Sequence, residues 1–125
     1  MIKDLLQSID SIYIAYGATD FRKQIHSLCN IVQSKYKMNP YEKSAYIFCN
    51  KKRNSIKVLC YDKNGFILAQ KTLLEADKMK FQWPKSKEDM EKITKEQLNW
   101  LLSGLKVCPE KYFKEIEIKQ EKMAI

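Results

Sequence analysis

The sequence predicts an α+β fold, in which an antiparallel β-meander packs against an N-terminal amphipathic helix and is followed by short C-terminal helices. Three observations predict this class: three consecutive segments with the composition of strands, a helical apolar repeat ahead of them, and a leucine-rich helical repeat behind them. A chain of 125 residues is long enough to bury a core without disulfide bonds. We therefore expect one domain over residues 1–125, with a frayed C-terminal end.

The meander is expected at Ser44–Cys49, Ser55–Tyr61 and Phe66–Thr72, which are rich in β-branched and aromatic residues and are bounded by turn residues. Asn64-Gly65 predicts a tight hairpin turn between the second and third strands, because both residues tolerate positive φ. Those two strands should therefore pair antiparallel. A further strand is predicted at Ser11–Tyr16.

The first helix is expected at Asp20–Lys37. Thr19 is a candidate N-cap, and Asp20 would place a carboxylate at the positive end of the helix dipole. Asn39-Pro40 ends the segment, because the residue before a proline disfavours helical backbone. Apolar side chains recur at helical spacing and should pack one helix face against the sheet; they are Phe21, Ile25, Leu28, Cys29, Val32 and Tyr36.

The face of the sheet that receives this helix stays open in the sequence. Side chains of a strand alternate between its two faces, and both sides of the second strand of the meander are apolar. One side carries Ile56, Val58 and Cys60, and the other carries Leu59 and Tyr61, joined by Leu68 of the third strand.

Two short helices are expected after the meander. Ser86 can cap the first, which would run through Lys92. Thr94 and Gln97 have the spacing of a capping box for the second, in which each side chain bonds the backbone of the other residue. Leucines at helical spacing follow this box, and Gly104 is a natural helix stop.

Positive charge favours a polyanionic partner. The chain has 23 Lys and Arg against 15 Asp and Glu, a net charge of +8 and a pI near 9.3, and nucleic acid is the commonest partner of such proteins. Lys51, Lys52 and Arg53 follow one another in the turn between the first two strands of the meander, and Lys57 lies close by. We expect them to contact phosphates; the alternative is a solvated loop. Further cations that would extend the patch are Arg22, Lys23, Lys85 and Lys87.

Two tryptophans suggest another kind of surface. Phe81 and Trp83 stand one residue apart, directly before Pro84, which indicates an extended strap. Its rings would either clamp the sheet to the C-terminal helices or form a stacking platform for bases. Trp100 lies off the centre of the leucine repeat, so it is a candidate partner contact or a residue at the boundary of the core.

Other functional classes find little support. No apolar run approaches the roughly 20 residues of a membrane span, and Asp4 and Gln7 interrupt the start too early for a signal peptide, so we expect a cytoplasmic protein. The cysteines lack zinc-site spacing, and we expect neither a metal nor a cofactor. His26 and Cys29 lie one helical turn apart but have no second ligand pair, which favours a packed helix face.

Catalysis is not expected either. Metal-assisted cleavage of a phosphodiester would need several converging carboxylates, for which Asp20, Asp62 and Glu75 are the candidates. Each has an ordinary explanation, as a helix start, a residue before a hairpin turn and a strand end. The single histidine has no nucleophile motif around it. The sequence therefore predicts a protein that is not an enzyme.

Three segments in register, Tyr16–Gln33, Ala45–Phe66 and Phe81–Leu105, closely resemble the small accessory protein called TnpB of insertion sequence 66 transposons, which is not the RNA-guided nuclease of the same name. The resemblance covers most of the chain. It implies a protein encoded beside a larger, separate transposase and needed for efficient transposition. Tyr61 stands where the family commonly has Trp, and Thr72 stands where it commonly has a cation.

The leading hypothesis is a non-catalytic accessory protein for transposition that binds DNA through the basic hairpin turn, with transposon ends as a candidate target. The alternative is a protein-interaction module that docks on the element's transposase and assists it. In that case Trp83 and Trp100 would be the apolar anchors.

Overall fold

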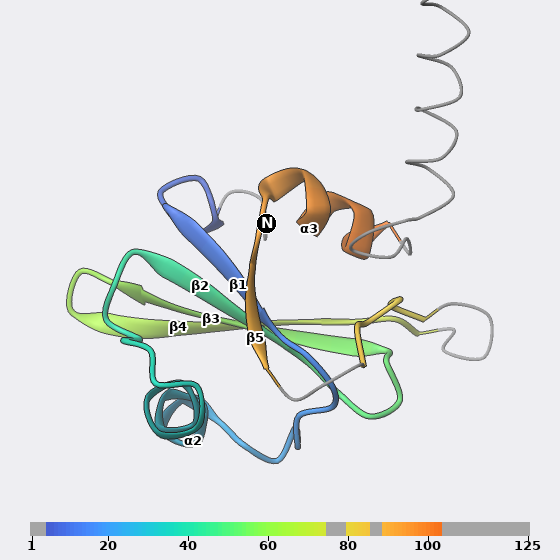
Figure 1. Ribbon diagram of the computed structural model, residues 1–125, viewed down its shortest axis with the longest axis horizontal. Coiled ribbons are helices and arrows are strands. Elements are labelled where there is room, and N and C mark those ends of the chain that lie inside the picture. Colours follow the sequence, from blue (N-terminus) through green and yellow to red (C-terminus); the bar gives the residue numbers. More distant parts are fainter. Residues whose placement is uncertain (1–4, 75–79, 86–88, 104–125) are drawn as a thin grey trace, which may run out of the picture.

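A five-stranded mixed sheet in the order β4-β3-β2-β1-β5 forms the centre of the protein (Figure 1). The computed structural model describes residues 5–74, 80–85 and 89–103. The α+β class is confirmed. The strands are β1 (Ser11–Ala15), β2 (Ser44–Cys49), β3 (Ser55–Asp62), β4 (Gly65–Thr72) and β5 (Met90–Ile93).

The predicted meander is confirmed, because β2 pairs antiparallel with β3 and β3 pairs antiparallel with β4. The position of its second turn was predicted one residue too late. Asp62 pairs with Gly65, so the two-residue turn consists of Lys63 and Asn64. Lys63 takes the left-handed conformation, with φ of 53°. The register is thus set by the pairing of the strands rather than by the Asn-Gly dipeptide alone.

The sheet is not purely antiparallel, and the first helix is not N-terminal. The strand β1 precedes that helix and pairs parallel with β2, so that Ser11 faces Ser44. Parallel neighbours need a long crossover connection, and the helical segment between β1 and β2 provides it. On its other side β1 pairs antiparallel with β5. The helix predicted to run from Ser86 through Lys92 is therefore wrong over its last three residues, because Met90–Ile93 is a strand. Ser86 and Lys87 lie outside the described residues.

The first helix is shorter than predicted. It comprises α2 (Ile25–Asn30) and a π-helical continuation, η1 (Ile31–Lys35), in which the Tyr36 amide donates to the Ile31 carbonyl at 3.2 Å. Thr19 does not cap it; the N-cap residue is Gln24, which makes no capping hydrogen bond through its side chain. Lys37 has a φ of 56°, so the chain leaves the helix before Asn39.

Both faces of the sheet are covered. The helix α2 packs on the face that carries Tyr46 and Leu59, which answers the question that the sequence left open. The opposite face, with Ile47 and Val58 at its centre, packs against Phe81, Trp83 and the helix α3. Figure 1 shows α2 below the sheet and α3 above it.

The predicted capping box at the start of α3 (Lys95–Leu102) is confirmed. The Gln97 amide donates to Thr94 Oγ1 at 3.0 Å, and the Thr94 amide donates to Gln97 Oε1 at 2.9 Å. Gly104 and the C-terminal end lie outside the described residues. Within the described part of the chain, neither helix is long and apolar enough to cross a bilayer.

Candidate nucleic-acid interface

Two adjoining hollows lie where β2 turns into β3. The first has a volume of about 700 Å³ and is lined by Arg22, Lys51 and Lys52 among its cations. The second has a volume of about 350 Å³, and its cations are Lys51, Arg53 and Lys85. Lys51 belongs to both. We call this end of the sheet, with its five cations, the basic end. It brings together five of the eight cations that the sequence predicted for the phosphate-binding patch; of the other three, Lys87 lies outside the described residues.

The turn at the basic end is held by its own polar groups. Asn50 Oδ1 accepts from the Asn54 amide at 3.0 Å and from the Ser55 amide at 3.1 Å. The Arg53 amide donates to the Asn50 carbonyl at 3.1 Å, and Arg53 has a φ of 59°. These bonds supply the backbone partners that a tight turn needs, so the cations project from a fixed loop.

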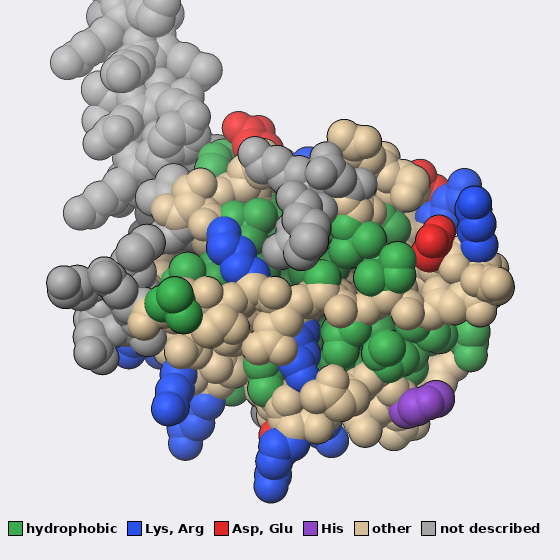
Figure 2. Space-filling model, turned by 180° about the vertical axis from the view of Figure 1, so that it is seen from behind, with side chains coloured by type: hydrophobic (Ala, Val, Ile, Leu, Met, Phe, Trp, Pro, Cys, Tyr) green, Lys and Arg blue, Asp and Glu red, His purple; other side chains and the backbone are tan. Residues whose placement is uncertain are grey.

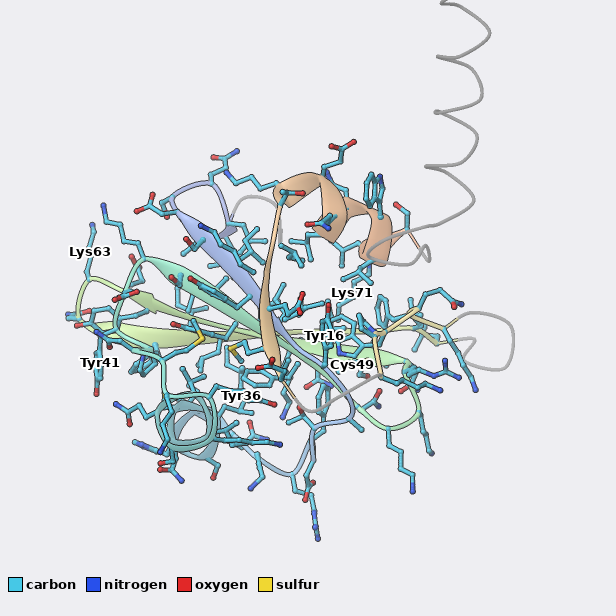
Figure 3. The ribbon with its side chains drawn as sticks, viewed as in Figure 1. Tyr16, Tyr36, Tyr41, Cys49, Lys63 and Lys71 are labelled. Carbon is cyan, nitrogen blue, oxygen red and sulfur yellow. The ribbon has the colours of Figure 1, made fainter. Side chains whose placement is uncertain are left out.

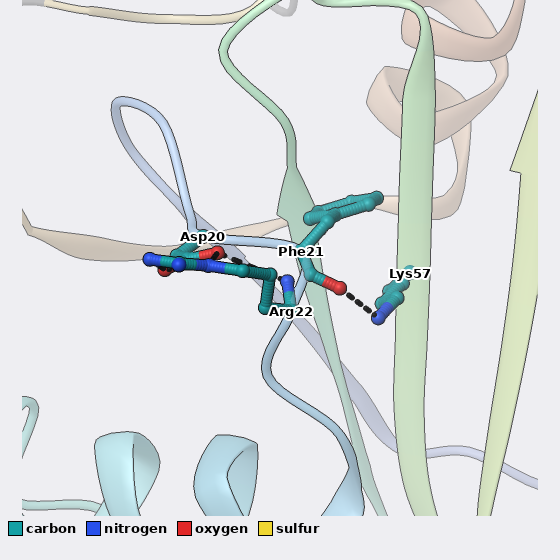
Figure 4. Close-up of polar contacts among 4 residues, drawn as sticks. All are labelled: Asp20, Phe21, Arg22 and Lys57. Carbon is teal, nitrogen blue, oxygen red and sulfur yellow. Dashed lines mark hydrogen bonds and ion pairs between the residues drawn. The ribbon is translucent and has the colours of Figure 1, made fainter.

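Asp20 and Arg22 both line the first hollow. Figure 4 shows the Asp20 carboxylate bound to Arg22. Arg22 Nη2 donates to Asp20 Oδ2 at 2.8 Å, and Arg22 Nε and the Arg22 amide donate to Oδ1 at 3.1 Å and 3.0 Å. These side-chain and backbone hydrogen bonds lower the pKa of Asp20 to about 2. The carboxylate organises a local turn, which competes with the helix start predicted at this position.

Lys57 is buried, unlike the other cations predicted here. Its side chain is 2 % exposed, and Nζ donates to the carbonyls of Phe21 and Lys23 at 2.9 Å each. Nζ also lies 4.9 Å from the centre of the Phe21 ring (Figure 4). Burial lowers the pKa of this lysine. Lys57 therefore ties the loop before α2 to β3, and its amine does not face the solvent as a phosphate contact would.

The two tryptophans differ in burial. Trp83 is 5 % exposed, and its indole Nε1 donates to the Ala15 carbonyl at 2.7 Å. It shares a core cluster with residues of the sheet and of α3, as expected of a clamp that joins the sheet to a C-terminal helix. Trp100 is half-buried on α3. Lys23 is also half-buried and does not line either hollow. Among the predicted anchors, Trp100 is thus the one with an exposed part.

The carboxylates considered for catalysis do not meet. Asp20 lines the hollow beside Ser55, the first residue of β3, whereas Asp62 is the last residue of that strand, roughly 23 Å away at 3.3 Å per residue. Glu75 lies outside the described residues. In the described ranges, no three His, Cys, Asp or Glu side chains come close enough to hold a metal ion.

The thiols are packed rather than poised for chemistry. Burial raises the pKa of Cys29 and Cys60, and it raises the pKa of Cys49 to about 12. A thiol must ionise to act as a nucleophile or a metal ligand, so these cysteines are held in their unreactive form. His26 is exposed on α2.

The comparisons with known proteins identify the family. The chain has no significant match among curated proteins or among solved structures. The family described as IS66 Orf2 like protein matches residues 10–111, a range that includes β1 through α3. The chain therefore belongs to the IS66 Orf2 like protein family and is an accessory protein of an insertion sequence.

Proposed function

We propose that this accessory protein is non-catalytic and binds DNA through the basic end. The observation that supports the proposal is the concentration of charge there. Five cations line the two hollows, whereas Asp20 is the one carboxylate among the described residues that line them. Figure 2 shows Lys and Arg side chains projecting from the lower edge of the molecule, away from most of the acidic side chains visible on that face.

The cations suit phosphate contacts better than base contacts. They project from a turn and from flanking loops, so no helix or ribbon presents them to a groove. Contacts of this kind position a protein on DNA without reading its sequence. Lys57 is left out of the proposed surface because its amine is occupied by two carbonyls, and Lys23 is left out because it does not line the hollows.

The proposal is tested by fluorescence anisotropy with labelled duplexes, one carrying the element's end sequence and one scrambled, over a series of salt concentrations. Five phosphate contacts predict that log K falls with log salt with a slope of about −4 to −5. The double variant Lys51→Glu and Lys52→Glu should bind at least roughly tenfold more weakly and reduce the steepness of that slope by about two.

Lys43→Glu is the matched control. Lys43 is exposed and directly precedes β2, at the strand end opposite the basic turn. Each charge reversal changes the net charge equally, so the comparison separates a local surface from overall charge. If Lys43→Glu lowered the affinity for DNA as much as each reversal in the double variant does, binding would depend on net charge. That result would contradict the proposal.

Docking on the transposase is the second candidate function. The observation that favours it is the half-buried indole of Trp100 on α3, an amphipathic side chain of the type that anchors interfaces. Trp83 does not contribute an exposed anchor, because its ring is buried against the sheet. Co-purification of the two proteins, lost on Trp100→Ala while thermal stability is retained, would support docking. Failure of the wild-type proteins to associate, with or without DNA, would remove it.

A further inference from the structure

The strand β4 forms one edge of the sheet. Of the described residues, only those of β3 pair with it, without interruption from Gly65 to Thr72. Native edge strands are commonly short, bulged or interrupted by charge or proline, because an open row of amides and carbonyls can pair with another chain. β4 has eight residues and no proline, and its run from Phe66 to Ala69 is apolar. This edge is therefore suited to accept another strand.

The backbone groups of alternate residues of β4 point away from β3. In an antiparallel pair, one residue bonds the facing strand through both its amide and its carbonyl, and the next residue turns both groups outward. The Leu73 amide donates to the Asn54 carbonyl at 2.7 Å, so the odd-numbered residues of β4 bond β3. Phe66, Leu68 and Gln70 thus direct their amides and carbonyls to the outside of the sheet. These groups are the hydrogen-bond partners that an added antiparallel strand needs.

A second copy of this strand fits the edge. We propose that two copies of the protein pair antiparallel through β4, about a two-fold axis at Leu68, so that their sheets become continuous. This register pairs all of Gly65–Lys71, because both ends of that range are equally far from Leu68. Leu68 then faces Leu68 of the second copy, and Ile67 faces Ala69. These side chains are half-buried in one copy, and apolar cross-strand pairs of this kind stabilise a sheet.

Charge complementarity favours this partner and this register. Lys71 of one copy faces Gly65 of the other, and Gly65 pairs with Asp62 of its own chain. Residues that face one another across strands share a face of the sheet, so Lys71 and Asp62 lie on the same side. A Cβ added at Gly65 would meet nothing within 4 Å, which leaves the path between them open. The roughly 10 Å across the glycine is within reach of a lysine side chain and a carboxylate. The two-fold axis repeats this ion pair, which selects the register more than it adds affinity.

The pairing also keeps the two basic ends apart. Thr72 lines the first hollow at the basic end. It lies four residues beyond Leu68, so Thr72 of one copy and Thr72 of the other are roughly 27 Å apart along the joint strands. That distance exceeds the Debye length of roughly 8 Å at physiological salt, so the two basic ends repel each other little. The inference goes beyond DNA binding and does not depend on it.

Sedimentation equilibrium of the full chain tests the pairing. The wild-type protein should be dimeric at micromolar concentrations. Gln70→Pro removes an outward amide and no bond to β3, so it should weaken dimerisation at least roughly tenfold. Gln70→Ala is the matched control, because it keeps the amide and should dimerise as the wild type does. Circular dichroism checks that both variants remain folded.

Charge reversal tests the partner and the register without altering the backbone. Asp62 and Lys71 are exposed, and within one chain they lie at opposite ends of the paired strands. Lys71→Asp should weaken dimerisation roughly three- to tenfold, and adding Asp62→Lys should restore it.

Three results would overturn the proposal. The first is a wild-type protein that stays monomeric up to about 100 μM. The second is a folded Gln70→Pro protein that dimerises as the wild type does, and the third is equal dimerisation of the single and double charge variants. If the wild-type protein alone is monomeric and Gln70→Pro abolishes its co-purification with the transposase, the edge would instead accept a strand of the transposase.

Discussion

Replacing the buried lysine of β3 tests what holds the basic end together. Lys57→Met keeps an unbranched side chain of similar reach and removes the amine. The carbonyls of Phe21 and Lys23 then lose the donor that each now has at 2.9 Å. The loop between these two residues carries Arg22, so the variant should loosen one wall of the first hollow as well as destabilise the fold.

Two opposing effects set the size of the change. A hydrogen bond to a charged group contributes about 1.5–3 kcal/mol, and two such bonds are lost. Removing the ammonium also relieves the cost of burying a charge at a site that is 2 % exposed, which amounts to several kcal/mol before compensation. Because two partly buried carbonyls are left without their donor, we expect the loss to prevail. The free energy of unfolding should fall by about 2–3 kcal/mol, which corresponds to about 8–12 °C in Tm for a domain of this size.

Urea unfolding at neutral pH measures the change. Lys71→Met is the matched control, because it makes the same replacement on β4, where Lys71 is labelled in Figure 3. Lys71 is exposed, so this variant should stay within about 0.5 kcal/mol of the wild type. A Lys57→Met protein as stable as the wild type, or more stable, would refute the reasoning. Desolvation of the ammonium would then outweigh its hydrogen bonds.

Two further predictions concern charge and pH. Asp20→Asn removes the one described carboxylate of the first hollow and frees Arg22 for a phosphate, while the new amide oxygen can still accept from the Arg22 amide. The affinity for duplex DNA should rise roughly three- to tenfold at low salt. An unchanged affinity would exclude Arg22 from the DNA-binding surface. The pKa of Cys49 is raised from 9.0 to about 12, so the folded state keeps a proton that the unfolded state loses. That stabilisation is complete below pH 9 and is lost as the pH rises toward 12, at up to about 1.4 kcal/mol per pH unit. In urea titrations between these pH values, Cys49→Ala should show a flatter dependence than the wild type, and an identical slope would contradict the assignment.

Local sequence patterns could predict the meander and the capping box, because their signals lie within a few residues of the structure that they specify. The parallel pairing of β1 with β2 could not be predicted in this way. It joins Ser11 to Ser44 across a helical crossover, and no local pattern encodes such a distant contact. Met90–Ile93 alternates poorly for a strand, yet it extends because the free edge of β1 offers it hydrogen-bond partners.

The basic end likewise has a part that local sequence predicts and a part that distant contacts determine. Lys51, Lys52 and Arg53 are neighbours in sequence, so their grouping could be predicted, and so could the patch that they form. Arg22 and Lys85 join them only because backbone bonds tie their segments to the end of β2 and to the basic turn.

The burial of Lys57 could have been predicted from the alternation of side chains along β3, although not from the number of nearby charges. Lys57 has the same strand parity as Leu59, which places it on the helix-covered side of β3. A single cation on an apolar strand face indicates a structural lysine, and its partners are then backbone carbonyls more often than a ligand.

The rigidity of the basic end bears on how it would use its charge. Charges on a mobile loop chiefly accelerate encounter with a polyanion, and their effect falls steeply with salt. Here Arg53 bonds the strap through its carbonyl, and Cys49 bonds the loop before α2 through its carbonyl. The backbone segments that carry the cations therefore hold their spacing, and binding restricts the cationic side chains alone, at a cost of up to about 2 kcal/mol each. Under the proposed function, such fixed anchor points would favour a nucleic acid whose phosphates match their spacing, which distinguishes a positioning surface from a general attraction for polyanions.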